Sequence, residues 1–379
     1  MMIYADNAAT TKISPAAKQA MLDCMEEYWG NPSSLYTLGQ KASSCLLNAR
    51  ETIATCLGAA PGEIYFTSGG SESDNQAILS AAHSGAAKGK KHLISTGIEH
   101  HAVLRTLEHL GTKGFDITLL PVGTDGILDA RDVAAAIRPD TALVTVMSSN
   151  NEIGTLQPIE EISRICREKG VIFHTDAVQS AGHLPVDVRK SGMDMLSLSA
   201  HKFHGPRGVG VLYVRKGIPL EPLIYGGSQE RGKRAGTENL PAIAGMAAAL
   251  KEATERLDST IPYVTGLRNQ LIEGLSEIPG SRLNGCVQSR LPGNVSFCFD
   301  NIEGEMLLLL LNQRGIAASS GSACASGSLE PSHVLRALGY SPELAKSALR
   351  LTLSESNTKE EIAEIIKNVR EIVEYLRNI

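Results

Sequence analysis

A lysine follows directly on a strand-like apolar run in the middle of the chain. The run Met193–Ser199 alternates apolar and small side chains, and Lys202 comes after it in the segment AHKFHGP. A lysine at the end of a core strand is unusual, because lysine is almost never fully buried without a partner. Burial disfavours the ammonium and yields a nucleophilic amine. Lys202 is therefore a candidate to form a Schiff base with an aldehyde cofactor. A surface lysine at the start of a loop is the alternative.

A carboxylate closes another strand-like run. Asp176 follows Val171–Thr175 in the segment VIFHTDAVQ, so it lies where ligands bind in open α/β sheets, at the carboxyl end of a strand. A pyridoxal phosphate site needs a carboxylate beside the pyridine nitrogen to keep that nitrogen protonated. Asp176 fits this role, and Gln179 three residues later fits a hydrogen bond to the ring hydroxyl. An aspartate that caps a helix at a turn is the alternative.

A glycine- and serine-rich turn is a candidate phosphate site. Gly70 and Ser71 lie in FTSGGSESDN, between the predicted strand Glu63–Thr67 and a helix. Glycines let backbone N–H groups face an anion, and a helix N-terminus adds positive potential. The turn matches neither GxGxxG nor a P-loop, so it indicates neither a dinucleotide nor ATP. A simple turn with a helix cap remains the alternative.

Two adjacent histidines begin the next predicted helix. His100 could stack on a planar ring and handle protons. His101 cannot point in the same direction from a helix, so metal chelation by this pair is not expected. A histidine at a helix start with no special role is the alternative.

Three further residues are candidates for the same functional site. Asn151 lies in the strand-end segment SSNNEIG, which suits a small polar ligand or a plain turn. Cys324 lies in SSGSACASGS, a loop of small residues that could carry a thiol into a site. Arg350 interrupts the apolar alternation SALRLTLS, where it could bind a substrate carboxylate or form an internal salt bridge.

The elements that must position these residues alternate between short strands and longer amphipathic segments. The predicted strands are Glu63–Thr67, His92–Ser95, Ile117–Pro121, Ala142–Met147, Val171–Thr175, Met193–Ser199 and Gly208–Val214. Helical segments between most of them predict a mainly parallel sheet with helices on both faces. The predicted strand Gly208–Val214 follows Lys202 so closely that it could run antiparallel to its neighbour in the sheet.

The remaining chain predicts a smaller α+β domain. It has predicted strands near Asn294–Phe299 and Ala348–Leu353, and helices near Gly304–Arg314 and Thr358–Arg377. A long helical segment over about Ala242–Ile278 is expected to contain the domain boundary or to end just before it. We expect a large domain of residues 15–257 and a small domain of residues 1–14 and 258–379.

Composition narrows the function classes. At 379 residues more than one domain is expected, and 42% hydrophobic with 20% charged residues is typical of a soluble globular protein. The net charge of −5 without a long basic run argues against nucleic acid as a partner. No leader pattern opens the chain, and Met306–Leu311 is too short to cross a membrane. The seven scattered cysteines contain no CxxC, so we expect a reducing cytoplasmic setting and no metal site.

Taken together, the motifs resemble those of the cysteine desulfurases of the NifS/IscS group, which belong to the class-V aminotransferase family of pyridoxal phosphate enzymes. The resemblance runs from about Tyr4 to the last helix. Its most specific segments are FTSGGSESDN, EHHAVL, NNEIGTLQPI, HTDAVQS, SAHKFHGPRGVG, RAGTENLP and SSGSACASGSLEPSHVLRALG. The Cys324 loop is similar to that of the group I members. Where the family often has Ala-Thr, this chain has Gly70-Ser71.

The resemblance implies a fold, an activity and a set of site residues. The fold would be that of the type I pyridoxal phosphate transferases, with a mainly parallel seven-stranded sheet and a smaller α+β domain. The enzyme would convert L-cysteine to L-alanine and leave the sulfur on Cys324 as a persulfide. By resemblance the cofactor would be held by Lys202, Asp176, Gln179, His100, Gly70, Ser71, Ser199 and His201, and the substrate carboxylate by Asn151 and Arg350.

The resemblance also implies partners. Thr237 would reach the cofactor phosphate of a second subunit, so a homodimer is expected. The sulfur would pass to an acceptor protein, such as an iron–sulfur scaffold, and Cys324 could serve as a transient cluster ligand. A selenocysteine lyase, a cysteine sulfinate desulfinase and a non-catalytic sulfur-relay protein of the same fold stay open.

Overall fold

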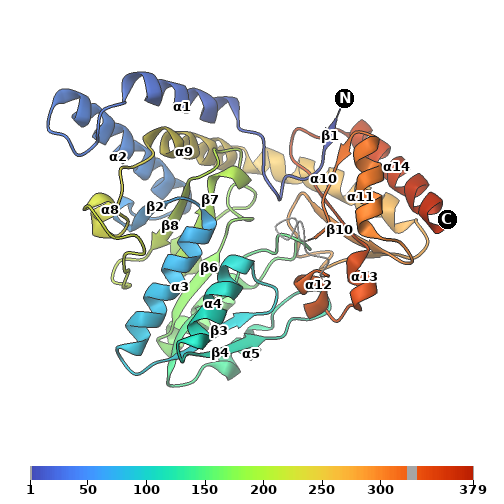
Figure 1. Cartoon of the computed structure of the whole chain (residues 1–379), viewed down its shortest axis with the longest axis horizontal. Coiled ribbons are helices and arrows are strands. Elements are labelled where there is room, and N and C mark those ends of the chain that lie inside the picture. The colour runs from blue at the N-terminus through green and yellow to red at the C-terminus, as the bar shows by residue number, and fades with distance from the viewer. Residues whose placement is uncertain (1, 322–330, 379) are drawn as a thin grey trace.

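A computed structural model describes residues 2–321 and 331–378 of the chain (Figure 1). The strands of its largest sheet are β2 (Ile64–Thr67), β3 (His92–Thr96), β4 (Asp116–Leu120), β5 (Thr141–Thr145), β6 (Ile172–Asp176), β7 (Met195–Ser199) and β8 (Gly210–Val214). The helices that precede and connect them are α1 (Pro15–Glu27), α2 (Thr37–Leu57), η1 (Pro61–Glu63), α3 (Gly70–Ala86), α4 (His101–Thr112), α5 (Ala130–Ala136), α6 (Ile159–Lys169), α7 (Val188–Ser191), η2 (Ala200–Lys202), α8 (Gln229–Gly232) and α9 (Leu240–Glu255).

The seven strands form one sheet in the order β2-β8-β7-β6-β5-β3-β4. Only β8 pairs antiparallel, with β2 on one side and β7 on the other, so the other strands share one direction. Their carboxyl ends therefore meet at one edge of the sheet. The predicted strands and the mainly parallel sheet are confirmed, and the orientation left open for the last strand is antiparallel.

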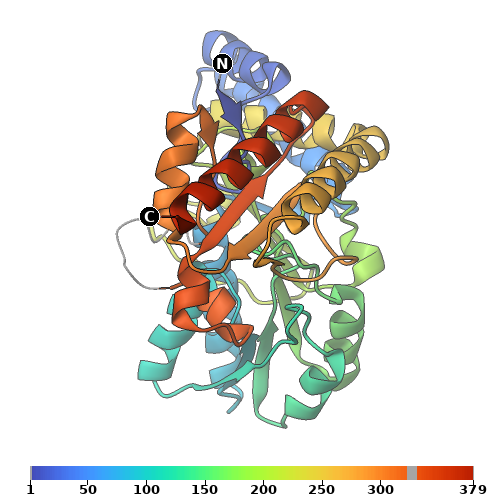
Figure 2. The same cartoon turned by 90° about the vertical axis from the view of Figure 1, so that its right-hand side faces the viewer.

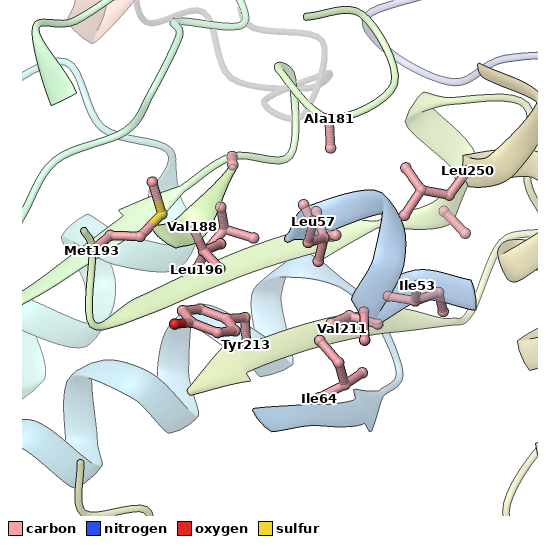
Figure 3. Packing of buried hydrophobic residues seen from close by; sticks show 14 of the residues in the cluster. Ile53, Leu57, Ile64, Ala181, Val188, Met193, Leu196, Val211, Tyr213 and Leu250 are labelled. Carbon is pink, nitrogen blue, oxygen red and sulfur yellow. The ribbon is translucent and has the colours of Figure 1, made fainter. Parts of the chain in front are cut away.

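Apolar side chains project from both faces of this sheet, and helices therefore cover each face. Successive residues of a strand point to opposite faces. In β7, Leu196 and Leu198 pack on the face covered by α2 and α9, whereas Met195 packs on the face covered by α3 and α4. Figure 3 shows the first of these faces, with Leu196, Val211 and Tyr213 of the strands, Ile53 and Leu57 of α2, and Leu250 of α9.

A second group of elements surrounds a core of its own. It contains β1 (Ile3–Tyr4), α10 (Leu257–Ser276), β9 (Ser281–Leu283), β10 (Asn294–Phe299), α11 (Gly304–Gln313), β11 (Ile316–Ala317), α12 (His333–Ala337), α13 (Pro342–Lys346), β12 (Ala348–Thr352) and α14 (Lys359–Arg377). The antiparallel sheet β12-β10-β9 has α10 and α14 side by side against it (Figure 2). Within residues 2–321 and 331–378, no helix combines the length and the apolar character that crossing a membrane requires.

The long helical segment predicted over about 242–278 is present, divided into two consecutive helices. The segment forms two helices, α9 and α10, which meet at Arg256. The Arg256 N–H closes the last turn of α9 by donating to Ala253, and Pro262 has no N–H with which to continue the bonding in the first turns of α10. We propose that the two domains meet at this junction, as residues 15–257 and residues 1–14 with 258–379, because separate apolar clusters form on its two sides.

A buried ion pair holds the turn before α9 against the large sheet. Glu230 accepts two hydrogen bonds from Arg50 of α2, at 2.5 and 2.9 Å, and one from the Phe66 N–H at 2.9 Å. Both charged side chains are buried, and the backbone at Glu230 and Arg231 has φ of 47° and 59°. The close bidentate geometry offsets the cost of a left-handed conformation that non-glycine residues rarely adopt.

Replacing Glu230→Ala is expected to lower the free energy of unfolding by about 3–5 kcal/mol, because it leaves the buried Arg50 guanidinium without its counter-charge. Chemical denaturation measures this. The control Glu168→Ala removes a solvent-exposed partner of Arg164 and is expected to cost about 0.5 kcal/mol or less. Equal costs for the two variants would contradict a stabilising role of the buried pair.

Candidate active site

A cavity of about 600 Å³ lies at the carboxyl edge of the large sheet. Its size is that of sites for small molecules and cofactors. The predicted site residues that line it are Gly70, Ser71, His100, Asn151, Asp176, Gln179, Ser199, His201, Lys202 and Arg350. The lining does not include Thr237, and Cys324 lies outside the described residues. The fold thus brings together residues that are far apart in the sequence, while their individual roles stay predictions.

Lys202 ends the short helix η2, which follows β7 directly. Its Nζ donates to the carbonyl oxygens of Ala8 at 2.6 Å and Ala9 at 2.9 Å, so the N-terminal segment forms the wall of the cavity beside the amine. His201 contacts Thr10 of the same segment at 3.2 Å through Nδ1. Burial lowers the pKa of His201 to about 4, and a neutral imidazole therefore stands beside the lysine.

Asp176 is the last residue of β6, the strand next to β7. Its carboxylate accepts from the Val178 N–H at 2.9 Å, while burial raises its pKa and the charges of His100 and Lys202 oppose that rise. Gln179 donates from Nε2 to the Ala8 carbonyl at 3.0 Å, which fixes its side chain in the cavity wall. The carboxylate and the lysine thus share the cavity from adjacent strands.

The turn between β2 and α3 has the geometry of an anion cradle. Gly69 has φ of 151°, which only glycine tolerates, and α3 begins at Gly70. A Cβ on Gly70 would lie 2.7 Å from Val178, and a Cβ on Gly210 would lie 2.6 Å from the Gly69 backbone. Gly69, Gly70 and Ser71 line the cavity at the start of a long helix. This arrangement fits a phosphate group.

His100 caps α4. Its Nδ1 accepts from the Ala102 N–H at 3.1 Å, which leaves the ring proton on Nε2 when the imidazole is neutral. The neighbouring His101 packs against His333 of α12 with 4.6 Å between the ring centroids, and both line the cavity. The different orientations predicted for His100 and His101 agree with this: their ring centroids lie 6.4 Å apart.

Arg350 enters the cavity from β12 and is 2% exposed. Its Nη2 pairs with Asp6 at 2.9 Å, and its Nη1 donates to the Asn151 carbonyl at 3.1 Å and the Gly321 carbonyl at 3.3 Å. Its buried Nε has no partner among the described residues. The internal salt bridge considered from the sequence is present, and one donor of the guanidinium is unused among the described residues.

Sequence reasoning missed four side chains of the cavity region, namely Asp74, Glu99, Glu152 and His333. Burial raises the pKa of Glu99 to about 8 although it accepts from Thr96 and Met147. Glu152 accepts from the Ser332 hydroxyl at the start of α12. Each lies in or beside a segment that carried a motif, but motif position alone does not reveal which residues the fold will bury together.

A second ion pair lies just beyond Lys202. His204 has φ of 64°, donates from Nδ1 to the Lys12 carbonyl at 2.9 Å, and lies 3.6 Å from the Glu355 carboxylate through Nε2. The Glu355 partner raises the pKa of His204 against the opposing effect of burial, and His204 lowers the pKa of Glu355 to about 2.

This pair predicts a pH dependence of stability. The raised pKa of His204 stabilises the fold below its unfolded pKa of about 6.5, and this contribution disappears as pH rises through the folded pKa. The lowered pKa of Glu355 stabilises the fold above about pH 4.3, and this stabilisation is lost as pH falls towards 2. The stability difference between the wild type and His204→Gln should therefore be larger at about pH 6 than at about pH 9. Thermal unfolding at both values measures it, and a constant difference would contradict the ion pair.

Comparison with known proteins places this geometry in a family. The sequence pattern of the aminotransferase class-V family matches residues 3–365. Cysteine desulfurase IscS of Methanosarcina thermophila is 50% identical over 377 residues, which cover 100% of this chain and 93% of that protein. The chain belongs to the aminotransferase class-V family, and the predicted resemblance to the NifS/IscS group is confirmed.

Solved structures agree with this assignment. A NifS-like protein superposes with a TM-score of 0.93 at 39% identity, covering 99% of this chain and all of that one. SspA in complex with cysteine superposes with a TM-score of 0.83 at 37% identity, covering 94% of this chain and 100% of that one. The predicted fold, a large mainly parallel sheet with helices plus a smaller α+β unit, is therefore confirmed.

Proposed function

We propose that this protein is a cysteine desulfurase, an enzyme that converts L-cysteine to L-alanine and transfers the sulfur first to Cys324, as a persulfide, and then to an acceptor. The observation that carries the proposal is the position of Lys202 and Asp176. They follow or end adjacent strands and line one cavity together with a glycine-rich turn. Relatives named cysteine desulfurase align over the full chain at about half identical residues.

The cavity suits pyridoxal phosphate. Lys202 would bind it covalently, Asp176 would face the ring nitrogen, Gln179 the ring hydroxyl, and His100 would stack on the ring. The phosphate would be held by Gly70, Ser71, Ser199 and His201, with Thr237 added from a second subunit. When bound, the cofactor supplies an electron sink for the carbanion character that develops at the substrate Cα.

The protein's own residues bind the substrate and move protons. Asn151 and the free donor of Arg350 would hold the carboxylate of L-cysteine. The Lys202 amine would take the proton from Cα, and the Ala8 and Ala9 carbonyls that accept from its Nζ would stabilise the resulting ammonium. His100 would assist these proton transfers through the proton on its Nε2.

Sulfur transfer is the part of the reaction assigned to Cys324. Its thiolate would attack the substrate sulfur, so that an S–S bond forms while the Cβ–S bond breaks. The electron pair of the broken bond stays with the carbon skeleton, and Cβ gains a proton to become the methyl group of alanine. The outer sulfur of the persulfide is then available to a second thiol.

We also propose a homodimer in the cytoplasm that passes sulfur to an acceptor protein, such as an iron–sulfur scaffold, with Cys324 as a transient ligand of a nascent cluster. Large apolar side chains exposed on the α1–α2 connection and before α8 support the dimer: Trp29, Leu35, Tyr36 and Tyr225. Large exposed apolar side chains of this kind are typical of protein interfaces. Light scattering should give the mass of two chains, and a monomer would contradict the shared site.

The deciding experiment measures alanine released from L-cysteine, with and without dithiothreitol, by the wild type and by Cys324→Ala. Alanine that rises with thiol and is lost in the variant supports a persulfide on Cys324. Alanine that survives in the variant favours a selenocysteine lyase or a cysteine sulfinate desulfinase instead. No alanine from cofactor-loaded wild type would overturn the assignment and favour a non-catalytic sulfur-relay protein.

A further inference from the structure

Asp74 is a buried carboxyl group behind the proposed cofactor site that the mechanism does not use. It lies in the second turn of α3, is 1% exposed and lines the cavity. Its Oδ1 has no hydrogen-bond partner among the described residues. A charged carboxylate in such a place is costly unless a cation or several donors compensate it. The surroundings of Asp74 therefore decide whether it is ionised.

The side chain nearest to Oδ1 that could carry a positive charge is His174, with its Nε2 at 3.6 Å. His174 is fully buried, and its two ring nitrogens are engaged with the hydroxyls of Thr145 and Ser197 at 2.8 and 2.9 Å. Burial lowers the pKa of His174 to about 3. His174 is therefore neutral and gives Asp74 no counter-charge.

The next neighbour is a second carboxyl group. One side-chain nitrogen or oxygen atom of each of Asp74, His100 and Asp176 lies within 4.8 Å of the others. Two carboxylates at this separation in a buried site do not both ionise, because their repulsion adds to the desolvation of each. Burial and the charge of Asp176 both raise the pKa of Asp74, and a hydrogen bond from the Ser197 side chain opposes this rise without cancelling it.

The cationic groups determine which of the two keeps the proton. The titratable groups around the pair are Glu99 and His100 after β3, His174 on β6, and Lys202 after β7. The charge of Lys202 favours an ionised Asp176, whereas burial and the neighbouring acids act against an ionised Asp74. The negative charge is therefore more stable on Asp176.

We propose that Asp74 and Asp176 form a carboxyl pair that holds one proton, on Asp74, and one negative charge, on Asp176. The single charge of the pair then lies on the carboxyl group that is assigned to the ring nitrogen of the cofactor. The assignment to the ring nitrogen rests on the proposed function, but the shared proton does not.

The proton is tested directly in cofactor-free protein. Carbon NMR of ¹³C-aspartate-labelled wild type should show one aspartate that stays protonated at neutral pH. Its signal should be absent from Asp74→Asn and present in Glu99→Gln, which controls for the other buried acid. If every aspartate of the wild type is ionised at neutral pH, or if the protonated signal persists in Asp74→Asn, the proposal is wrong. A wild type in which every aspartate is ionised overturns the proposal even where a variant does not fold.

The position of the charge is tested in cofactor-loaded protein, through the pH midpoint of the visible absorption band. Asp176→Asn removes a unit negative charge that stabilises a nearby cation, and should therefore shift the midpoint down by roughly one pH unit or more. Asp74→Asn replaces one neutral group by another and should leave the midpoint in place. A downward shift in Asp74→Asn like that of Asp176→Asn would place the charge on Asp74 and overturn the proposal. Absence of any visible band in the wild type would instead count against the proposed function, and the NMR result would stand.

Discussion

Lys202→Ala is expected to abolish alanine formation, with a loss of about 10⁴-fold or more, and to remove the visible absorption of the bound cofactor. The lysine has two assigned tasks, which are covalent attachment of the cofactor and proton transfer at the substrate Cα, and general acid–base catalysis alone contributes about 10²–10⁴-fold. Alanine at this position also leaves the Ala8 and Ala9 carbonyls without their donor. Absorption spectra and alanine assays on the purified variant give the two readouts.

The matched control is Lys216→Ala, which removes an exposed lysine after β8 that does not line the cavity. Its activity and spectrum are expected to equal those of the wild type. Lys202→Arg separates charge from nucleophilicity, because arginine keeps a cation near the carbonyls but stays protonated and cannot attach the cofactor. An intact visible band in either variant of Lys202 would assign covalent attachment to another residue.

The second large effect is expected for Asp176→Asn, in which the turnover number should fall by about 10²–10³-fold, the range found when one preorganised electrostatic group is removed. Asparagine has nearly the same shape and can still accept from the Val178 N–H, so the fold should persist. It carries no charge, however, and cannot keep a pyridine nitrogen protonated. The loss should therefore appear mainly in turnover and only slightly in the affinity for cofactor.

Asp194→Asn serves as its control. Asp194 is a buried aspartate at the opposite end of β7, where it accepts from the Phe173 N–H and pairs with Arg215. Its replacement should cost stability while the turnover of the folded enzyme stays the same. A similar loss of turnover in both variants would show that burial of an aspartate, rather than its place opposite the cofactor, explains the effect.

Local patterns in the sequence were sufficient for the strands and for most of the site. The run before Lys202 and the run before Asp176 each mark a strand by their apolar character, and adjacent parallel strands bring their ends together. The tight turn at Gly69 and Gly70 likewise depends on residue type, since its backbone conformation requires glycine. The helical character of the segment after Leu240 was also predicted from local pattern, whereas the break at Arg256 was not.

Only the tertiary structure decided the electrostatics of the site. Lys202 meets the Ala8 carbonyl from 194 positions away, and Arg350 meets Asp6 from 344 positions away. The sequence by itself determined which chemical groups stand at the strand ends, because backbone periodicity is local. It could not determine that the buried Asp74 lies beside Asp176, because desolvation and pairing depend on which distant segments pack together. Those long-range contacts set which carboxyl group carries the charge.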